Sequence, residues 1–550
     1  MNSGIMKHTA AVLAGILMLA SAGCSDNKTE TSGTAVAKRN DPAMYNERGT
    51  FPIVKEKKTV SLLTSANPLI QDFDTNYLTR LVEEKTGVDL EISLLPATDG
   101  GQKFAVMVAS QTELPDIINA VPGSFDDYCY KGIAIPVNDY YADPEVSYYF
   151  HQATTEEERA ELLKNSRLAD GNNYSIFRYS KNAWNEYSYR GWMNKTWLDK
   201  LGLPMPETTE DFYNTLTAFK NNDMNGNGEA DEIPFMGSTD GWNQNPVPFI
   251  MNAFIYTDPK QNYLFVEDGK VDVAFNKPEW KAGLEYINKL VKDGLLSPLS
   301  FTQNVTQFKT ILENPEKQVM GSIAAGSLTV YTDATSSNRQ DMQPMKPLTG
   351  PEGKCYATYN PSVPNNATFI SKYCEDPETA FRVLDYMYEP EATIVSRYGE
   401  PGVHWEYLTE EEKASAGVDF MGNAPTFKEI VNIWTQPQNS HWLGVHPNIN
   451  MGKNNVLPPA TDMTAVTVPL YVDKHPEEII AILTHTSDEL LDLSDIETSI
   501  KSYVQECMTR FVMGDKPFSE WDSYVKELDD MGLSQYLEIK QTAYDRMNSK

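Results

Sequence analysis

Oxygen-bearing side chains recur at close spacing between Asp223 and Glu232, and this pattern is the clearest chemical signal in the sequence. Side chains at the first, third, fifth, ninth and tenth positions, with a backbone carbonyl at the seventh, are the oxygens that a hard cation such as Ca²⁺ binds. Two intervening glycines permit a tight turn, because glycine adopts positive φ without steric strain. The candidate ligands are Asp223, Asn225, Asn227, Glu229, Asp231 and Glu232. The alternative is that the two Asn-Gly pairs only form a hairpin turn.

Motifs of common catalytic sites are absent from the sequence. It contains no G-x-S-x-G, no H-E-x-x-H and no G-x-x-x-x-G-K-[ST] motif. We therefore expect a protein that is not an enzyme. A glycosidase is the rival hypothesis, because its two carboxylates are defined only by a separation of about 5–9.5 Å in space, and the chain has 77 acidic residues.

The candidate cation loop follows a helix with a clear start. Thr208 is a typical N-cap residue, and the acidic Asp211 follows three positions later, as in a capping box. Phe212, Leu216 and Phe219 then recur at helical spacing on one apolar face. The spacing predicts an amphipathic helix that ends at the loop.

The N-terminal part of the mature chain alternates strand and helix patterns. Residues 59–63 and 88–94 are strand-like, and a helix over 75–85 lies between them with Gly87 as its C-cap. Strands that alternate with helices predict an α/β fold with an open, mainly parallel sheet. Residues 494–547 are predicted to be helical throughout.

Several separate stretches resemble one protein family. Residues 206–234 resemble the pattern PxTxxEFxxxLxAFKxxDxNGNGxADEIP of the family 1 extracellular solute-binding proteins of ABC importers. Within that family they are similar to the large lipoprotein subgroup with alginate-oligosaccharide-binding proteins. Residues 106–118, 398–407 and 521–546 also match the family, although Pro401 and Trp405 depart from its usual residues. The resemblance implies a periplasmic-binding-protein type II-like fold of two α/β lobes joined by hinge crossings, and a structural role for calcium.

The same resemblance implies a division of the chain. The expected parts are 1–24 as signal peptide, 25–56 as flexible tether, 57–175 as the first part of lobe 1, 176–335 as the first part of lobe 2 with the calcium loop, 336–398 as the return to lobe 1, and 399–550 as the second, helical part of lobe 2.

The N-terminus has the features of an export signal. The apolar run over residues 10–20 is too short to span a membrane, and small residues precede Cys24 as in a lipobox. We expect Cys24 to be lipidated (diacylglyceryl and palmitoyl chains), which would anchor the mature protein outside the cytoplasm at the cell membrane. Cleavage by an ordinary signal peptidase after Ala22 is the alternative.

The charge balance narrows the range of partners. With 46 basic and 77 acidic residues the formal net charge is −31, which repels nucleic acid and excludes it as a partner. Beyond Cys24, no cysteine lies in a C-x-x-C pair. A Cys355–Cys374 disulfide and scattered buried thiols both remain open.

Aromatic residues are the candidate ligand contacts. Tryptophan and tyrosine offer flat apolar faces with a polar edge, and the C–H faces of sugar rings pack on such surfaces. The residues that lie in polar, loop-like stretches beside the presumed crossings are Trp184, Tyr189, Trp242 and Trp405. A core role is the alternative for each, and Trp197 and Trp280 are expected in the core because they recur with Leu and Ile at helical spacing.

Together these features predict the substrate-binding lipoprotein of an ABC importer. It would act as a monomer with the importer's permease subunits and enclose an oligosaccharide by hinge closure. A secreted surface glycoside hydrolase or lyase is the alternative, and a non-transport adhesin is a third possibility. The sequence does not identify the sugar, and some relatives take peptides.

Overall fold

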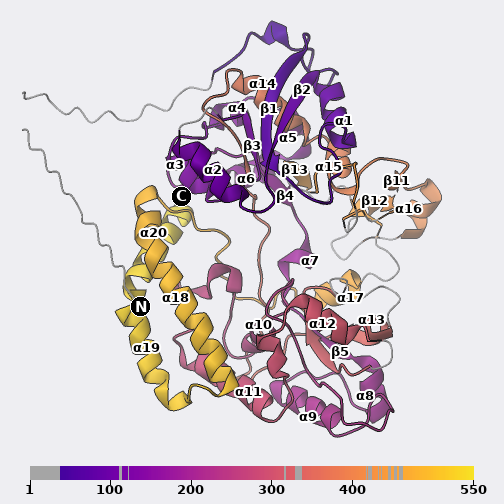
Figure 1. Cartoon of the computed structure of the whole chain (residues 1–550), viewed down its shortest axis with the longest axis vertical. Helices are drawn as coiled ribbons and strands as arrows, with labels where there is room; N and C mark the ends of the chain where they lie inside the picture. Colours follow the sequence, from indigo (N-terminus) through magenta and orange to yellow (C-terminus); the bar gives the residue numbers. More distant parts are fainter. Residues whose placement is uncertain are drawn as a thin grey trace, which may run out of the picture. The chain divides into compact units, whose positions relative to one another are not determined.

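A four-stranded sheet organises the N-terminal half of the fold in the computed structural model (Figure 1). The strand order is β10-β3-β1-β2, with β1 parallel to β2 and β3 and with β10 antiparallel to β3. The strands are β1 (Lys58–Ser65), β2 (Val88–Leu95), β3 (Ile117–Asn119) and β10 (Thr368–Ile370). Leu62 and Leu63 of β1 are buried in two different hydrophobic clusters, so both faces of the sheet are covered, as is usual for parallel strands.

The structure describes residues 38–110, 114–121, 123–314, 318–328, 337–416, 418, 424–431, 433–434, 437–443, 447–450, 455–457 and 463–549. The expected signal peptide with Cys24, and residues 25–37 of the expected tether, lie outside the described residues. Among the described helices, none has both the length and the apolar character that a membrane span requires.

Helices cover both faces of the first sheet. The helix α1 begins where the Asn76 side chain accepts a hydrogen bond from the Leu78 N–H, and it ends at Gly87, whose φ of 77° closes the helix in the left-handed region. This confirms the helix and C-cap expected from the sequence. The helices of this part are α1 (Tyr77–Thr86), α2 (Gly100–Ala109), α3 (Phe125–Tyr130), α4 (Asn138–Ala142), α5 (Tyr148–Ala153), α6 (Glu156–Asn165), α14 (Pro377–Tyr386) and α15 (Pro390–Tyr398), with the 3-10 turn η1 (Pro42–Met44).

A second sheet, of order β8-β5-β9, is wholly antiparallel. The expectation of a mainly parallel sheet is therefore confirmed for the first sheet, and it fails for the second sheet. In the second sheet, β5 pairs with strands that are distant in the sequence. Local sequence patterns cannot indicate such pairings. The elements of this part are α7 (Ala183–Glu186), β5 (Gly191–Asn194), α8 (Lys195–Leu201), α9 (Thr209–Lys220), α10 (Pro246–Met251), η2 (Pro259–Gln261), β6 (Leu264–Glu267), β7 (Lys270–Val273), α11 (Pro278–Lys292), η3 (Pro298–Phe301), α12 (Val305–Leu312), β8 (Ser322–Ala324), α13 (Ser337–Asp341), β9 (Met342–Pro344), α17 (Thr464–Thr467) and η5 (Val468–Leu470).

The C-terminal region is helical, as expected, but it forms three separate helices, and the first of them begins before residue 494. Thr486 and Glu489 make a capping box that starts the first of them. They are α18 (Ser487–Met513), α19 (Trp521–Asp530) and α20 (Leu533–Asn548), with η6 (Phe518–Glu520) between the first two. Their apolar faces share one buried cluster with α11 and with Trp280 and Trp197, which confirms the core role expected for these two tryptophans.

The segment after residue 398 packs differently from the expected division. Trp405, Phe427 and Trp442 lie in the buried cluster of the first sheet, whereas Met345 and Leu348 lie in the cluster of the second part. These contacts favour a return to the first lobe near β10, and they place Trp405, Phe427 and Trp442 beside the first sheet. The remaining elements are β4 (Arg178–Ser180), β11 (Trp405–Tyr407), α16 (Glu410–Ala416), β12 (Pro425–Glu429), β13 (Asn448–Asn450) and β14 (Asn455–Val456).

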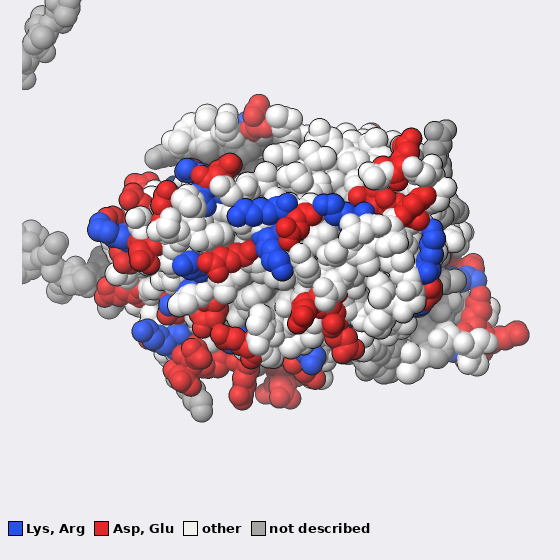
Figure 2. Space-filling model, turned by 90° about the horizontal axis from the view of Figure 1, so that it is seen from below, with Lys and Arg blue, Asp and Glu red and all other residues white. Residues whose placement is uncertain are grey.

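Charged residues on the surface are mixed in sign. On the face shown in Figure 2, lysine and arginine side chains stand beside aspartate and glutamate and form no broad basic area. Cys129, Cys355, Cys374 and Cys507 are all free. The Cys355–Cys374 disulfide is therefore not formed.

Candidate ligand-binding site

The loop at the end of α9 is held by its first carboxylate. Asp223 accepts hydrogen bonds from the backbone N–H groups of Gly226 (2.6 Å) and Gly228 (2.9 Å). Both glycines have a φ of 78°, in the left-handed region that other residues adopt only with strain. The capping box of Thr208 and Asp211 that starts α9 is also present, as expected.

Side chains of the loop converge on Asp231. The amide groups of Asn225 and Asn227 donate to its two carboxylate oxygens at 2.9 and 3.0 Å. Glu232 instead accepts from the Met224 N–H at 2.7 Å and so closes the base of the loop. The structure thus brings together the predicted ligands Asn225, Asn227 and Asp231, while Asp223 orders the turn and Glu232 has a backbone partner.

The donor set of this loop fits a hard cation. Among the described residues, no group of three or more His, Cys, Asp or Glu side chains could hold a metal ion by itself. A cation here would therefore depend on amide and carbonyl oxygens beside the carboxylates of Asp223 and Asp231, which is how Ca²⁺ loops are built. The Glu229 carbonyl stands at the seventh position of the loop, where such loops use a backbone oxygen. Lys200 of α8 donates to the Asp223 and Met224 carbonyls at 2.8 and 3.1 Å and ties the loop to the fold.

Two of the predicted aromatic residues, Trp184 and Trp242, are connected through Arg190 and Gly326. Both are partly exposed. The carbonyl of Trp242 accepts from the Gly326 N–H at 2.9 Å, and Arg190 donates to the carbonyls of both Trp184 and Gly326. Asn243, next to Trp242, donates to the Ser188 hydroxyl at 2.7 Å. These contacts join α7, the start of β5 and the end of β8 into one partly open, aromatic and polar site.

Tyr189 belongs to different surroundings. Burial, together with the nearby Asp258 and Tyr263, raises the pKa of its hydroxyl. Its neighbour Arg190 contacts Trp184, and its other neighbour Ser188 accepts a hydrogen bond from Asn243. The structure does not bring Tyr189 to the tryptophan pair.

Trp405 was expected in the cleft, and this expectation is wrong. Its side chain is fully buried, and its indole N–H donates to the Gly399 carbonyl at 2.7 Å. Phe427 and Tyr407 pack on its ring with centroid distances of 5.6 and 5.0 Å. A ring enclosed in this way offers no face to a ligand, so Trp405 is a core residue.

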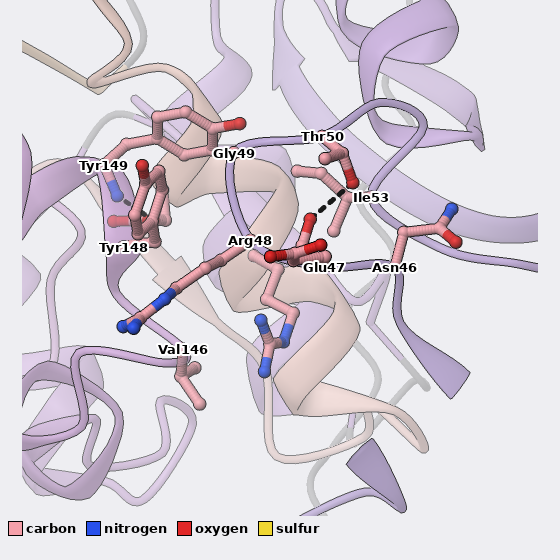
Figure 3. A pocket seen from close by; sticks show the side chains of 11 residues that line it. Asn46, Glu47, Arg48, Gly49, Thr50, Ile53, Val146, Tyr148 and Tyr149 are labelled. Carbon is pink, nitrogen blue, oxygen red and sulfur yellow. Dashed lines mark hydrogen bonds between the residues drawn. The ribbon is translucent and has the colours of Figure 1, made fainter. Parts of the chain in front are cut away.

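Two cavities differ in what they can hold. The first, shown in Figure 3 beside Arg48 and Tyr148, measures about 20 Å³, which is room for roughly one water molecule. The second measures about 240 Å³ and is lined mainly by polar residues, among them Asn185 and Glu186 of α7, Lys260 and Asn360. Only the second has room for a small polar ligand, and it adjoins the helix that bears Trp184.

Arg190 and Gly326 are site residues that sequence reasoning missed. Arg190 ends an unusually aromatic run, from Trp184 through Tyr187 and Tyr189, and it precedes a buried strand. A charged residue between aromatic residues and a buried strand could have indicated a functional role for Arg190. No sequence feature indicates a role for Gly326, because that role depends on a tryptophan far away in sequence.

Comparison with known proteins identifies the family. The model of the family described as bacterial extracellular solute-binding protein matches residues 64–394. The fructooligosaccharide ABC transporter substrate-binding protein FusA of Streptococcus pneumoniae serotype 4 is 27% identical over 537 residues, covering 92% of this chain and 94% of FusA.

Solved structures show the same fold at lower identity. An HMO-binding, ABC-transporter-associated solute-binding protein from Bifidobacterium longum infantis superposes with a TM-score of 0.77 at 17% identity, covering 90% of this chain and 100% of that one. A structure of S. pneumoniae FusA described as an EF-hand mutant in complex with fructo-nystose superposes with a TM-score of 0.68 at 24% identity, covering 89% and 99%.

Proposed function

Because this chain belongs to the bacterial extracellular solute-binding proteins, we propose that it captures an oligosaccharide for an ABC importer. The observation that supports this most is its correspondence with FusA along nearly the whole length of both chains. The partly exposed pair Trp184 and Trp242, beside polar groups, suits sugar rings, whose C–H faces pack on indoles while their hydroxyls seek hydrogen bonds.

The mechanism follows from differential affinity. A ligand that contacts both lobes only in a closed state shifts the population toward that state. The permease subunits of the importer would then recognise the closed form. Matching relatives are binding proteins, and we propose that this chain likewise binds without catalysis and acts as a monomer.

Binding and turnover are separated by one experiment. Calorimetry with kestose, nystose and maltotriose should show one-to-one binding to at least one of them, and chromatography of the same samples after prolonged incubation should show intact sugar. Release of shorter products would instead support the glycoside hydrolase or lyase. Saturable binding of peptides with no response to any sugar would contradict the oligosaccharide proposal.

We also propose that the loop at Asp223–Glu232 holds a structural Ca²⁺. The proposal is supported by the donor set and by the Asp223 contacts to Gly226 and Gly228; a relative, FusA, has been solved as an EF-hand mutant. When bound, the ion would neutralise the carboxylates of Asp223 and Asp231 and hold the loop at the end of α9.

Anchoring at the membrane is proposed through Cys24, from the sequence pattern before it. Mass spectrometry of the mature protein should find a lipidated N-terminal cysteine. An unmodified N-terminus at Gly23 would contradict the anchor.

A further inference from the structure

A buried arginine contacts the aromatic pair of the candidate site. Arg190 is fully buried, and its guanidinium carbon lies 3.7 Å from the centroid of the Trp184 ring. The same group donates to the Trp184 carbonyl. Stacking and hydrogen bonding together fix both the plane and the backbone of Trp184, since a guanidinium is a rigid planar fork.

The same arginine also reaches the segment behind Trp242. Its second nitrogen donates to the Gly326 carbonyl, and the Gly326 N–H donates to the Trp242 carbonyl. A β-carbon on Gly326 would lie 2.6 Å from Cδ2 and 2.8 Å from Cε3 of Trp242. Gly326 has no positive φ, so glycine is not needed here for backbone conformation. It is needed because the indole of Trp242 packs directly against the backbone and leaves no room for a side chain.

The arginine is itself fixed by the second sheet. The Arg190 carbonyl accepts from the Ala325 N–H at 2.9 Å, and the following residue, Gly191, starts β5 and pairs with Ala324 of β8. Arg190 therefore transmits the geometry of a buried sheet to two partly exposed rings.

We propose that Arg190 is a positioning residue for sugar binding that holds Trp184 and the Gly326 support of Trp242 as one preformed surface. This rests on the proposed function. A preformed surface binds more tightly because its side chains lose less freedom when the ligand arrives. The class of ligand is a carbohydrate with two ring faces to present, and the arginine itself does not touch it.

The test compares Arg190→Lys with Gly326→Ala, using kestose, nystose and maltotriose as probes. Lysine keeps the charge but loses the planar fork, and we expect affinity to fall roughly three- to thirtyfold. Gly326→Ala leaves Arg190 intact and displaces only Trp242, and we expect a loss of similar size at a nearly unchanged melting temperature.

A double-mutant cycle separates positioning from general damage. In a Trp184→Ala background, Arg190→Lys should weaken binding much less than in the wild type, because coupled residues are not additive. Arg382→Lys is the matched control: its guanidinium lies 4.0 Å from the Tyr45 ring centroid and is ion-paired with Glu378, so it removes the same chemistry elsewhere and should leave affinity unchanged.

Fully additive losses, or wild-type affinity in folded Arg190→Lys, would overturn the proposal. If Arg190→Lys does not fold, wild-type affinity in Gly326→Ala overturns it equally. If the wild type binds no probe, the proposed function fails independently of the role of Arg190, and tryptophan fluorescence then tests that role. The emission of Trp184 is obtained as the difference between the spectra with and without Trp184→Phe, in the wild-type protein and in Arg190→Lys. The two difference spectra should differ, and identical ones would refute the positioning role of Arg190.

Discussion

The tryptophans of this chain differ in exposure because of what surrounds each ring. Trp184 and Trp242 are partly exposed beside polar groups, whereas Trp405 is enclosed by aromatic neighbours. All three occur in polar, loop-like sequence, so residue type and spacing could predict the candidate set but could not divide it. The decisive contacts, such as Trp405 with Phe427, join residues on different strands that no local pattern links.

Substitution of Trp405 tests this division at the residue scale. Trp405→Ala should lower the free energy of unfolding by about 3–5 kcal/mol, because it opens a cavity in a packed core. Trp242→Ala should instead cost on the order of 1–3 kcal/mol of binding free energy, through lost apolar contact, with little change in melting temperature. Denaturant unfolding measures the stability of both variants, and calorimetry measures their sugar affinity. Weak sugar binding by a stable Trp405→Ala protein would return that residue to the site.

Elements with local signals were predicted well, and those with distant partners were not. The capping box of α9 and the Gly87 end of α1 depend on residues within one turn, and both are present. The antiparallel β5 ladder depends on strands contributed from beyond residue 320. Its direction could not be predicted because no turn joins these strands directly.

The loop after α9 gives a prediction at the element scale. If it binds Ca²⁺, a chelator should lower the melting temperature, since a ligand at 100 times its dissociation constant adds about 2.7 kcal/mol to the folded state. Asp231→Ala should abolish the chelator effect. Asp199→Ala is the matched control, because that exposed carboxylate forms an ion pair with Lys195 on α8. Equal melting of the wild type with and without chelator, on metal-loaded protein, would refute the ion.

We expect the N-terminus of α18 to be sensitive to pH through His485, which directly precedes the N-cap residue Thr486. Burial and the positive charge of Lys540, 3.4 Å from its Nε2, lower the pKa of His485 from 6.5 to about 4. A depressed histidine pKa contributes stability above pH 6.5 that is lost as the pH falls toward 4. The loss is at most about 3 kcal/mol.

His485→Gln should therefore flatten the fall in melting temperature between pH 7 and pH 4.5. Asp385 has the opposite effect in this range, because burial raises its pKa to about 7 and its protonation favours folding. That contribution is common to both proteins and cancels in their difference. Parallel curves for the wild type and His485→Gln would show that His485 does not contribute.

At the scale of the whole molecule, the family and fold class could be predicted because motifs occur along most of the chain. The division into lobes could not be placed as well. Trp405 and Trp442 complete the cluster of the first sheet, although they come after residue 398. Their sequence neighbours resemble a surface segment, and only packing assigns them to a core.

The interleaving of the two cores can be tested by truncation. A protein that ends at Tyr398 lacks Trp405 and Trp442 of the first cluster and all of α18 to α20 from the second. We expect it to be unfolded, with broad denaturant transitions and rapid proteolysis, while the chain over 38–549 unfolds cooperatively. A stable, protease-resistant product ending near residue 398 would show that the first core closes without the later residues.

This interleaving also constrains how the protein reaches its folded state after export. The first sheet is complete only when Phe369 pairs with Ile118, and β4 is paired only when Ile449 reaches Tyr179. Contacts between residues so distant along the chain slow folding, because the intervening segment must be closed before they form. The second core similarly waits for the final helices. A chain that crosses a membrane N-terminus first would therefore expose apolar strands until its C-terminal helices have emerged, and exposed strands of this kind are prone to aggregation.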